Sequence, residues 1–187
     1  MQLDIISVAA IITAASAIFG IPIAVYMALR GIPFSLNRGT LLAGLLAGSV
    51  YICFALANKL TTAANAIVLQ FTAPVFIVLF SAVLYKKEIR KPDLAVVLVV
   101  LAGIALFFFD QLGPSTVLGN FVAIAAGMFM AGMYMAVDRL EPQERFSAIV
   151  IGQAFAFLIG LSAVIIIKPV MNVTTVSCIL ILGVFQL

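Results

Sequence analysis

Histidine is absent from this sequence of 187 residues, and cysteine and charge are both scarce. Without histidine, the chain lacks the usual zinc ligand of intramembrane proteases and the base of any Ser-His catalytic pair. The two cysteines, Cys53 and Cys178, each lie inside an apolar run, so they build no disulfide framework and no metal-ligand spacing. Because no catalytic constellation is visible, we predict that the chain is not an enzyme and needs no metal or other cofactor.

Charged residues make up only 9% of the chain, whereas 65% of its residues are apolar and the mean hydropathy is +1.31. This composition predicts an integral membrane protein rather than a soluble domain. The net charge of +3 therefore does not point to nucleic acid; we expect a lipid bilayer as the surrounding partner. The acidic residues all lie at the ends of apolar runs or in loops, so no proton relay through a buried carboxylate is visible.

Six apolar runs are each long enough to cross a bilayer, which requires about 20 residues of helix. They cover residues 5–29, 40–58, 63–85, 94–109, 117–137 and 148–167. A seventh run, 176–187, is too short to cross, so the chain looks cut in mid-span. The runs predict an all-α fold, a polytopic transmembrane helical bundle.

The basic residues are unevenly divided between the two sets of loops. Eight lie in the loops after the first, third and fifth runs, whereas only Lys59 and Lys168 lie in the alternate loops. By the positive-inside rule the first set is cytoplasmic, so we expect the N-terminus of this chain to lie outside. The N-terminus also lacks the basic region of a secretory signal, and the first run should therefore remain as a membrane span.

Small residues recur at a spacing of four within several runs. Such spacing lets helix backbones approach closely in lipid, where packing rather than the hydrophobic effect drives association. We therefore predict helix-packing faces on two runs, marked by Gly44, Gly48, Gly152, Ala156 and Gly160.

Polar residues concentrate in the first half of the run 63–85. Pro74 lacks an N–H group and so frees the carbonyl of Gln70, four residues earlier. That carbonyl and the amides of Gln70 and Asn65 would face a polar cavity, because unsatisfied groups facing lipid are costly. Two interpretations stay open: a substrate-lining face, or a kink with hydrogen bonds between helices.

Further polar and aromatic residues lie within the predicted spans. Tyr51 and Tyr134 are candidate aromatic contacts in the substrate cavity, with anchoring at the membrane interface or bonding between helices as the alternative. The amides of Asn58, Asn120 and Gln153 are weaker candidates, for which bonding between helices is the alternative. The methionines of the run 117–137 fit gap-filling better than a cavity lining.

The stretch 60–110 carries four short motifs in order: Thr-Thr-Ala-Ala-Asn-Ala, Thr-Ala-Pro-Val-Phe, Lys-Lys-Glu and Leu-Ala-Gly-Ile-Ala-Leu. Together they resemble the EamA domain of the drug/metabolite transporter superfamily. Gly119-Asn120-Phe121 resembles the start of a second such repeat, and the last five residues resemble its third helix. The resemblance implies ten-helix carriers built as two inverted five-helix repeats. Residues 1–110 would then hold the last four helices of the first repeat, and 117–187 the start of the second.

The resemblance implies a secondary transporter of a small-molecule substrate, most simply an exporter of metabolites working by alternating access. We accordingly expect an integral protein of the bacterial cytoplasmic membrane, with a homodimer as a possible assembly. The alternative is a truncated or non-transporting membrane protein, a scaffold that needs a partner subunit. A water-accessible cavity at Gln70 would distinguish the two, because a scaffold needs none.

Overall fold

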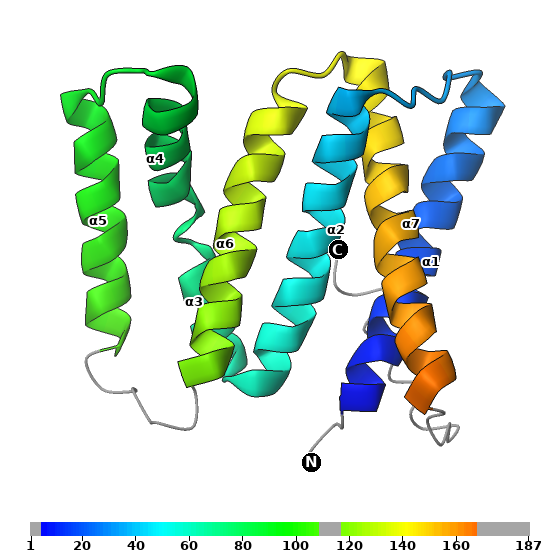
Figure 1. Ribbon diagram of the computed structural model, residues 1–187, viewed down its shortest axis with the longest axis horizontal. Helices are drawn as coiled ribbons and strands as arrows, with labels where there is room; N and C mark the ends of the chain where they lie inside the picture. Colours follow the sequence, from blue (N-terminus) through cyan, green and yellow to red (C-terminus); the bar gives the residue numbers. More distant parts are fainter. Residues whose placement is uncertain (1–4, 109–116, 168–187) are drawn as a thin grey trace.

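The computed structural model describes residues 5–108 and 117–167 and shows helices joined by short connections (Figure 1). The helices are α1 (Ile5–Arg30), α2 (Arg38–Leu60), α3 (Ala63–Gln70), α4 (Ala73–Tyr85), α5 (Lys91–Phe108), α6 (Val117–Val137) and α7 (Pro142–Ile167). No strand occurs in these two ranges. The prediction of an all-α helical bundle is confirmed.

Five helical segments in the described ranges are long and apolar enough to cross a membrane. They are α1, α2, α3 taken together with α4, α6 and α7. The predicted fourth span forms the helix α5, but it is not among the five, so its crossing stays a prediction. The partial run 176–187 lies outside the described residues.

The structure differs from the prediction at the start of α7, which begins at Pro142 rather than at the apolar residue 148. Proline suits the first helical turn, since the N–H it lacks has no partner there. The Glu144 carboxylate then accepts a hydrogen bond from the backbone N–H of Glu141, at 3.2 Å. A polar, capped turn therefore extends the helix beyond its apolar run.

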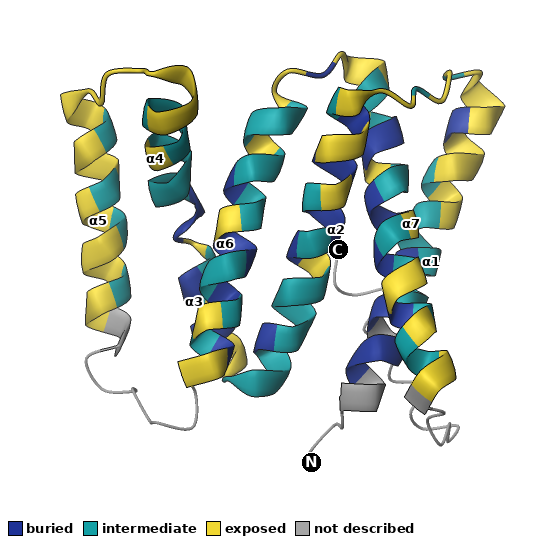
Figure 2. Ribbon diagram, viewed as in Figure 1, coloured by how far each residue is buried: buried dark blue, intermediate teal, exposed yellow. Residues whose placement is uncertain are grey.

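Helix α2 lies at the centre of the bundle and packs against both α6 and α7, while α1 packs mainly against α7 (Figure 1). Helices α3 and α4 lie against α6, and α5 contacts only α3 and α4 among the pairs in substantial contact. Residues at these helix contacts are buried, whereas much of α5 is exposed (Figure 2). Val99 and Leu106 are two of its exposed residues. Because these exposed side chains are apolar, they suit contact with lipid.

Small residues lie where α2, α7 and α1 approach most closely. A Cβ atom added to Gly48 would lie 2.7 Å from the carbonyl oxygen of Gly152, and one added to Gly44 would lie 2.6 Å from Ile151. Ala156 is fully buried next to α1, and a Cβ atom on Gly160 would meet the backbone of Ala9. All five predicted packing residues thus lie at helix contacts.

The connection between α1 and α2 is tied to the first turns of α7. The Glu144 carboxylate accepts hydrogen bonds from the Asn37 amide at 2.6 Å and the Ser35 hydroxyl at 3.3 Å. The buried Ser147 hydroxyl accepts a third from the Ser35 backbone N–H at 3.0 Å. Asn37 also caps α2, so this contact fixes the start of two helices.

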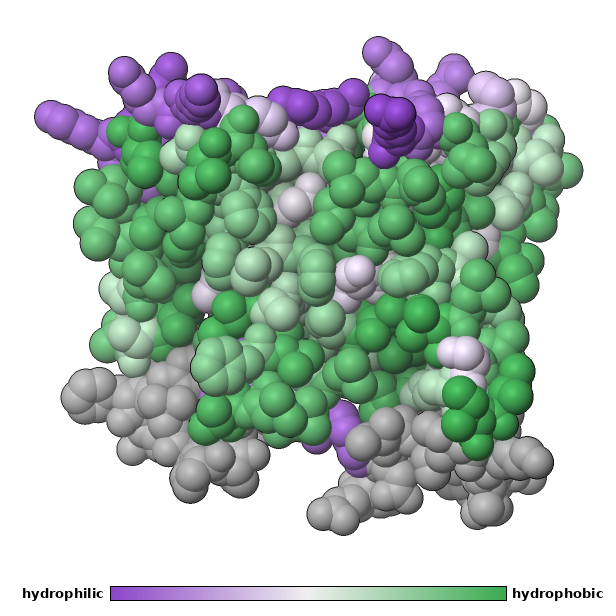
Figure 3. All heavy atoms as spheres, in the orientation of Figure 1, coloured by the Kyte–Doolittle hydropathy of each residue, from purple (hydrophilic) through white to green (hydrophobic). Residues whose placement is uncertain are grey.

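Hydrophilic atoms gather at one end of the bundle, where the α1–α2, α4–α5 and α6–α7 connections lie (Figures 1 and 3). We call this the basic end, because these connections and the adjoining helix ends carry eight basic residues. They are Arg30, Arg38, Lys86, Lys87, Arg90, Lys91, Arg139 and Arg145. The fold therefore gathers on one side the charges that the sequence distributes over three loops.

Candidate functional site

The predicted span 63–85 is two helices, α3 and α4, separated by Phe71 and Thr72. The break follows from local chemistry. Pro74 offers no N–H to the Gln70 carbonyl, and the buried Thr72 hydroxyl instead donates to the Leu69 carbonyl at 2.7 Å. The sequence predicts a kink here, and the structure shows a two-residue turn. Phe71 and Thr72 keep near-helical φ and ψ angles, and the N–H of Phe76 again donates to the Thr72 carbonyl at 3.2 Å.

Helix α6 presents its backbone to this break. A Cβ atom added to Gly127 would lie 2.5 Å from the Thr72 hydroxyl oxygen and 3.0 Å from the Gln70 carbonyl oxygen. The Gln70 side chain also faces α6, because its amide donates to the sulfur of Met130 at 3.5 Å. Glycine at 127 thus allows irregular backbone to lie directly against a neighbouring helix, a feature that discontinuous helices of transporters use at binding sites.

The break connects to the basic end along one face of α4. Pro74, Ile77 and Ser81 are spaced by three and four residues, so they share a face of this helix. Ile77 and Ser81 line a cavity, and Tyr134 lines it from α6. We call the boundary between this face of α4 and helix α6 the α4–α6 seam; it runs from Gln70 at the break to the cavity.

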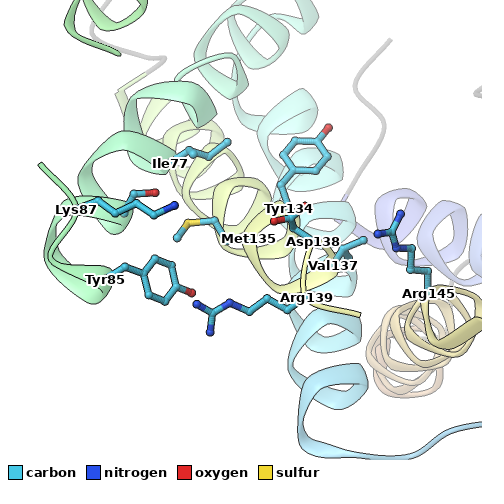
Figure 4. Close-up of a pocket in the computed structure, with 10 residues that line it drawn as sticks. Ile77, Tyr85, Lys87, Tyr134, Met135, Val137, Asp138, Arg139 and Arg145 are labelled. Carbon is cyan, nitrogen blue, oxygen red and sulfur yellow. The ribbon is translucent and has the colours of Figure 1, made fainter. Parts of the chain in front are cut away.

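The cavity at the basic end has a volume of about 630 Å³, a size typical of small-molecule sites (Figure 4). Helix α4, helix α6 and the start of α7 supply its walls. The lining residues are Ile77, Ser81, Tyr85, Lys87, Tyr134, Met135, Val137, Asp138, Arg139 and Arg145. Three basic side chains and one carboxylate therefore face the same space.

Two of the basic side chains are held in place by neighbours. The Arg139 guanidinium lies over the ring of Tyr85, 4.1 Å from its centre, and the two side chains are adjacent in Figure 4. The Arg145 Nε group donates to the Leu140 carbonyl at 3.3 Å. Stacking and hydrogen bonding restrict both guanidinium groups before any ligand arrives.

A second cavity of about 510 Å³ lies on the other side of α4, toward α5. It shares Ile77, Ser81 and Lys87 with the first cavity. Its further charged residues, Glu88, Arg90 and Asp93, are of mixed sign. The α4 helix thus has open space on two sides at the basic end.

The structure places Asn65 away from both cavities, at the start of α3. It is 1% exposed, and its amide donates to the Thr61 hydroxyl at 3.2 Å, which in turn donates to the Asn120 side chain at 3.0 Å. Its own side-chain oxygen is buried and has no hydrogen-bond partner among the described residues. Asn65 therefore links α3 to α6 at the end opposite the basic end.

The remaining candidates are dispersed. Tyr51, on α2, is 43% exposed and lines neither cavity. Asn58 donates to the Phe54 carbonyl of its own helix at 2.9 Å, and the buried Gln153 packs against Gly20 of α1. Of the predicted cavity residues, the structure thus brings only Gln70, Pro74 and Tyr134 onto the seam.

The charged lining of the cavity is what sequence reasoning missed. The sequence indicates only a topological role for Lys87, Arg139 and Arg145. It shows Asp138 only as an acidic residue in a loop. Nothing in their local sequence indicates that the ends of α4 and α6 meet. In the described ranges, no group of three His, Cys, Asp or Glu residues is placed to hold a metal ion.

The fold defines a helical membrane protein, with apolar spans, a discontinuous helix and a cavity at one end. Comparison with family models gives the particular family: the model described as the EamA-like transporter family matches residues 2–109. This match covers more than half of the chain, so the chain belongs to the EamA-like transporter family, as its motifs predict. Searches of curated proteins and of solved structures gave no match.

Proposed function

We propose that the chain works as a secondary transporter that moves a small molecule by alternating access along the α4–α6 seam. The observation that carries the proposal is the interrupted span α3/α4: its break lies against Gly127 of α6, and the same two helices, α4 and α6, line the cavity at the basic end. Irregular backbone at membrane depth is tolerated where it is buried in protein or lines a water-filled path. The family assignment supports transport in general, and the seam supports this particular route.

We further propose that the structure corresponds to a state open to the cytoplasm. The cavity lies at the basic end, which the positive-inside rule assigns to the cytoplasmic side. A substrate that enters from the cytoplasm is exported. On this proposal, the Gln70 amide and the carbonyl freed by Pro74 are the first polar groups that a substrate meets beyond the cavity.

The test is the accessibility of single cysteines in a chain whose Cys53 and Cys178 are replaced by alanine. We expect a membrane-impermeant thiol reagent, added to inside-out vesicles, to label Ser81→Cys quickly and Gln70→Cys at a measurable rate. The matched control is Leu79→Cys on α4, which is 46% exposed but lines neither cavity and so faces lipid.

A labelling rate at Gln70→Cys equal to that at Leu79→Cys would reject the seam as a substrate path. The same result would favour the alternative function, a non-transporting scaffold, because a scaffold needs no water at the break. If the labelling rate at Gln70→Cys falls when the exterior-facing state is trapped, the result would support alternating access rather than a fixed pore.

A further inference from the structure

We infer that the cavity at the basic end is a binding site for an oxyanion, a phosphate or carboxylate group carried by a small molecule. This inference deepens the proposed function, on which it rests, by naming the chemical class of the substrate. Its basis is the lining: Lys87, Arg139 and Arg145 face one space that contains a single carboxylate, Asp138. The lining therefore carries a net charge of about +2 at neutral pH.

The geometry of Arg139 suits this ligand. Its guanidinium carbon lies 4.1 Å from the centre of the Tyr85 ring, a cation–π contact that uses none of the five N–H donors of the group. A planar fork of this kind binds carboxylate or phosphate through two parallel hydrogen bonds. Because the ring already restricts the side chain, less conformational entropy is lost when an anion binds.

The other groups add to the same site. Arg145 uses one of its five donors on the Leu140 carbonyl, so its side chain is anchored while the rest of the fork can bind an anion. Lys87 extends into the cavity from the opposite wall (Figure 4). Ser81 adds a neutral hydroxyl group to the lining.

Membrane topology alone would place basic residues at this end, but it does not select which of them share a cavity. Lys86 precedes Lys87 in the chain and does not line the cavity. Arg30 lies over Tyr26, 5.7 Å from the ring centre, and forms an arginine–tyrosine pair outside it. These two residues are matched controls, since their loss removes the same charge from the same end.

The experiment measures equilibrium binding by the full chain, with two probes. Inorganic phosphate is titrated calorimetrically into protein held in phosphatidylcholine nanodiscs, with chloride at equal ionic strength as the reference. Retention of phosphatidylglycerol by protein in neutral detergent is measured by native mass spectrometry. The first probe represents a free anion, and the second represents a lipid headgroup that carries the same phosphate chemistry.

We expect phosphate to bind, and we expect Arg139→Gln and Lys87→Gln each to weaken binding about tenfold, the effect of losing a hydrogen bond to a charged group. Lys86→Gln and Arg30→Gln should leave it unchanged. Retention of phosphatidylglycerol alone, lost in the same two variants, would overturn the small-molecule ligand and assign the oxyanion site to a lipid headgroup. Binding of neither probe, or equal losses in all four variants, would overturn the inference. Because both measurements are made at equilibrium, they are independent of whether the chain transports anything.

Discussion

A single methyl group at Gly48 should separate α2 from α7. In Gly48→Ala the new Cβ atom would lie 2.6 Å from Cδ1 of Phe155 and 2.7 Å from the Gly152 carbonyl oxygen. The ring can rotate away, but the carbonyl belongs to the backbone of α7, so the two helices themselves must move apart. Overpacking of this kind costs about 1–3 kcal/mol, and contact with backbone places it in the upper half of that range.

Part of this cost is offset, because alanine is a better helix former than glycine by about 1 kcal/mol. The net destabilisation of Gly48→Ala should therefore be about 1–2 kcal/mol, which lowers the midpoint of thermal unfolding by about 2–8 °C in a chain of this size. Gly103→Ala on α5 is the matched control, since its Cβ atom would have no neighbour within 4 Å. The control gains helix propensity without a clash, so its midpoint should stay constant or rise.

The assay is a thermal scan of the protein in mild detergent with a thiol-reactive dye. Cys53, a partly buried free thiol on α2, reports opening of the bundle once Cys178 is replaced by alanine. Gly48→Ala is expected to lower the midpoint, and Gly103→Ala to leave it constant or raise it. If Gly48→Ala unfolds at or above the midpoint of Gly103→Ala, the close approach of α2 and α7 does not exist in solution.

Three other outcomes are expected. Pro74→Ala restores a backbone donor at the α3/α4 break, so a continuous helix should form; the thermal midpoint should be maintained while thiol labelling along the seam falls severalfold. Glu144→Ala should expose the α1–α2 connection and make it about tenfold more sensitive to trypsin, whereas Glu141→Ala, whose carboxylate does not bond that connection, should not. Reporter fusions placed after Lys91 and after Arg145 should both report cytoplasm; an exterior signal from either would reverse the proposed orientation.

The helices themselves were predictable from the sequence, because long apolar runs bounded by charges and turns leave few other structures in a bilayer. The break at Pro74 was also indicated, since proline removes a donor wherever it stands. The exact start of α7 was missed because the turn from Pro142 to Glu144 is polar, and hydropathy does not register a helix stabilised by its cap.

The partners of each helix were not predictable. Spacing marked Gly44 and Gly48 as packing residues, but nothing local shows that they meet α7 rather than a sequence neighbour. Nothing local shows that Gly127 meets the α3/α4 break either. The cavity lining depends on two chain segments, around Lys87 and around Arg139, whose proximity is a property of tertiary packing alone. The local sequence determines which residues share a face of each helix. Which faces pack together depends on the tertiary structure of the whole chain.

The central place of α2 has a consequence for how the protein assembles during synthesis. Its closest contacts are with α6 and α7, which are made last among the described helices, whereas α1 touches α2 only lightly. The segment 2–109 that matches the family model thus lacks the surfaces that bury the glycine face of α2. Until α6 and α7 enter the bilayer, the earlier helices have lipid where they will later have protein. The bundle therefore closes around α2 only after α6 and α7 have been synthesised, and quality-control proteases can sample its exposed small-residue face until then.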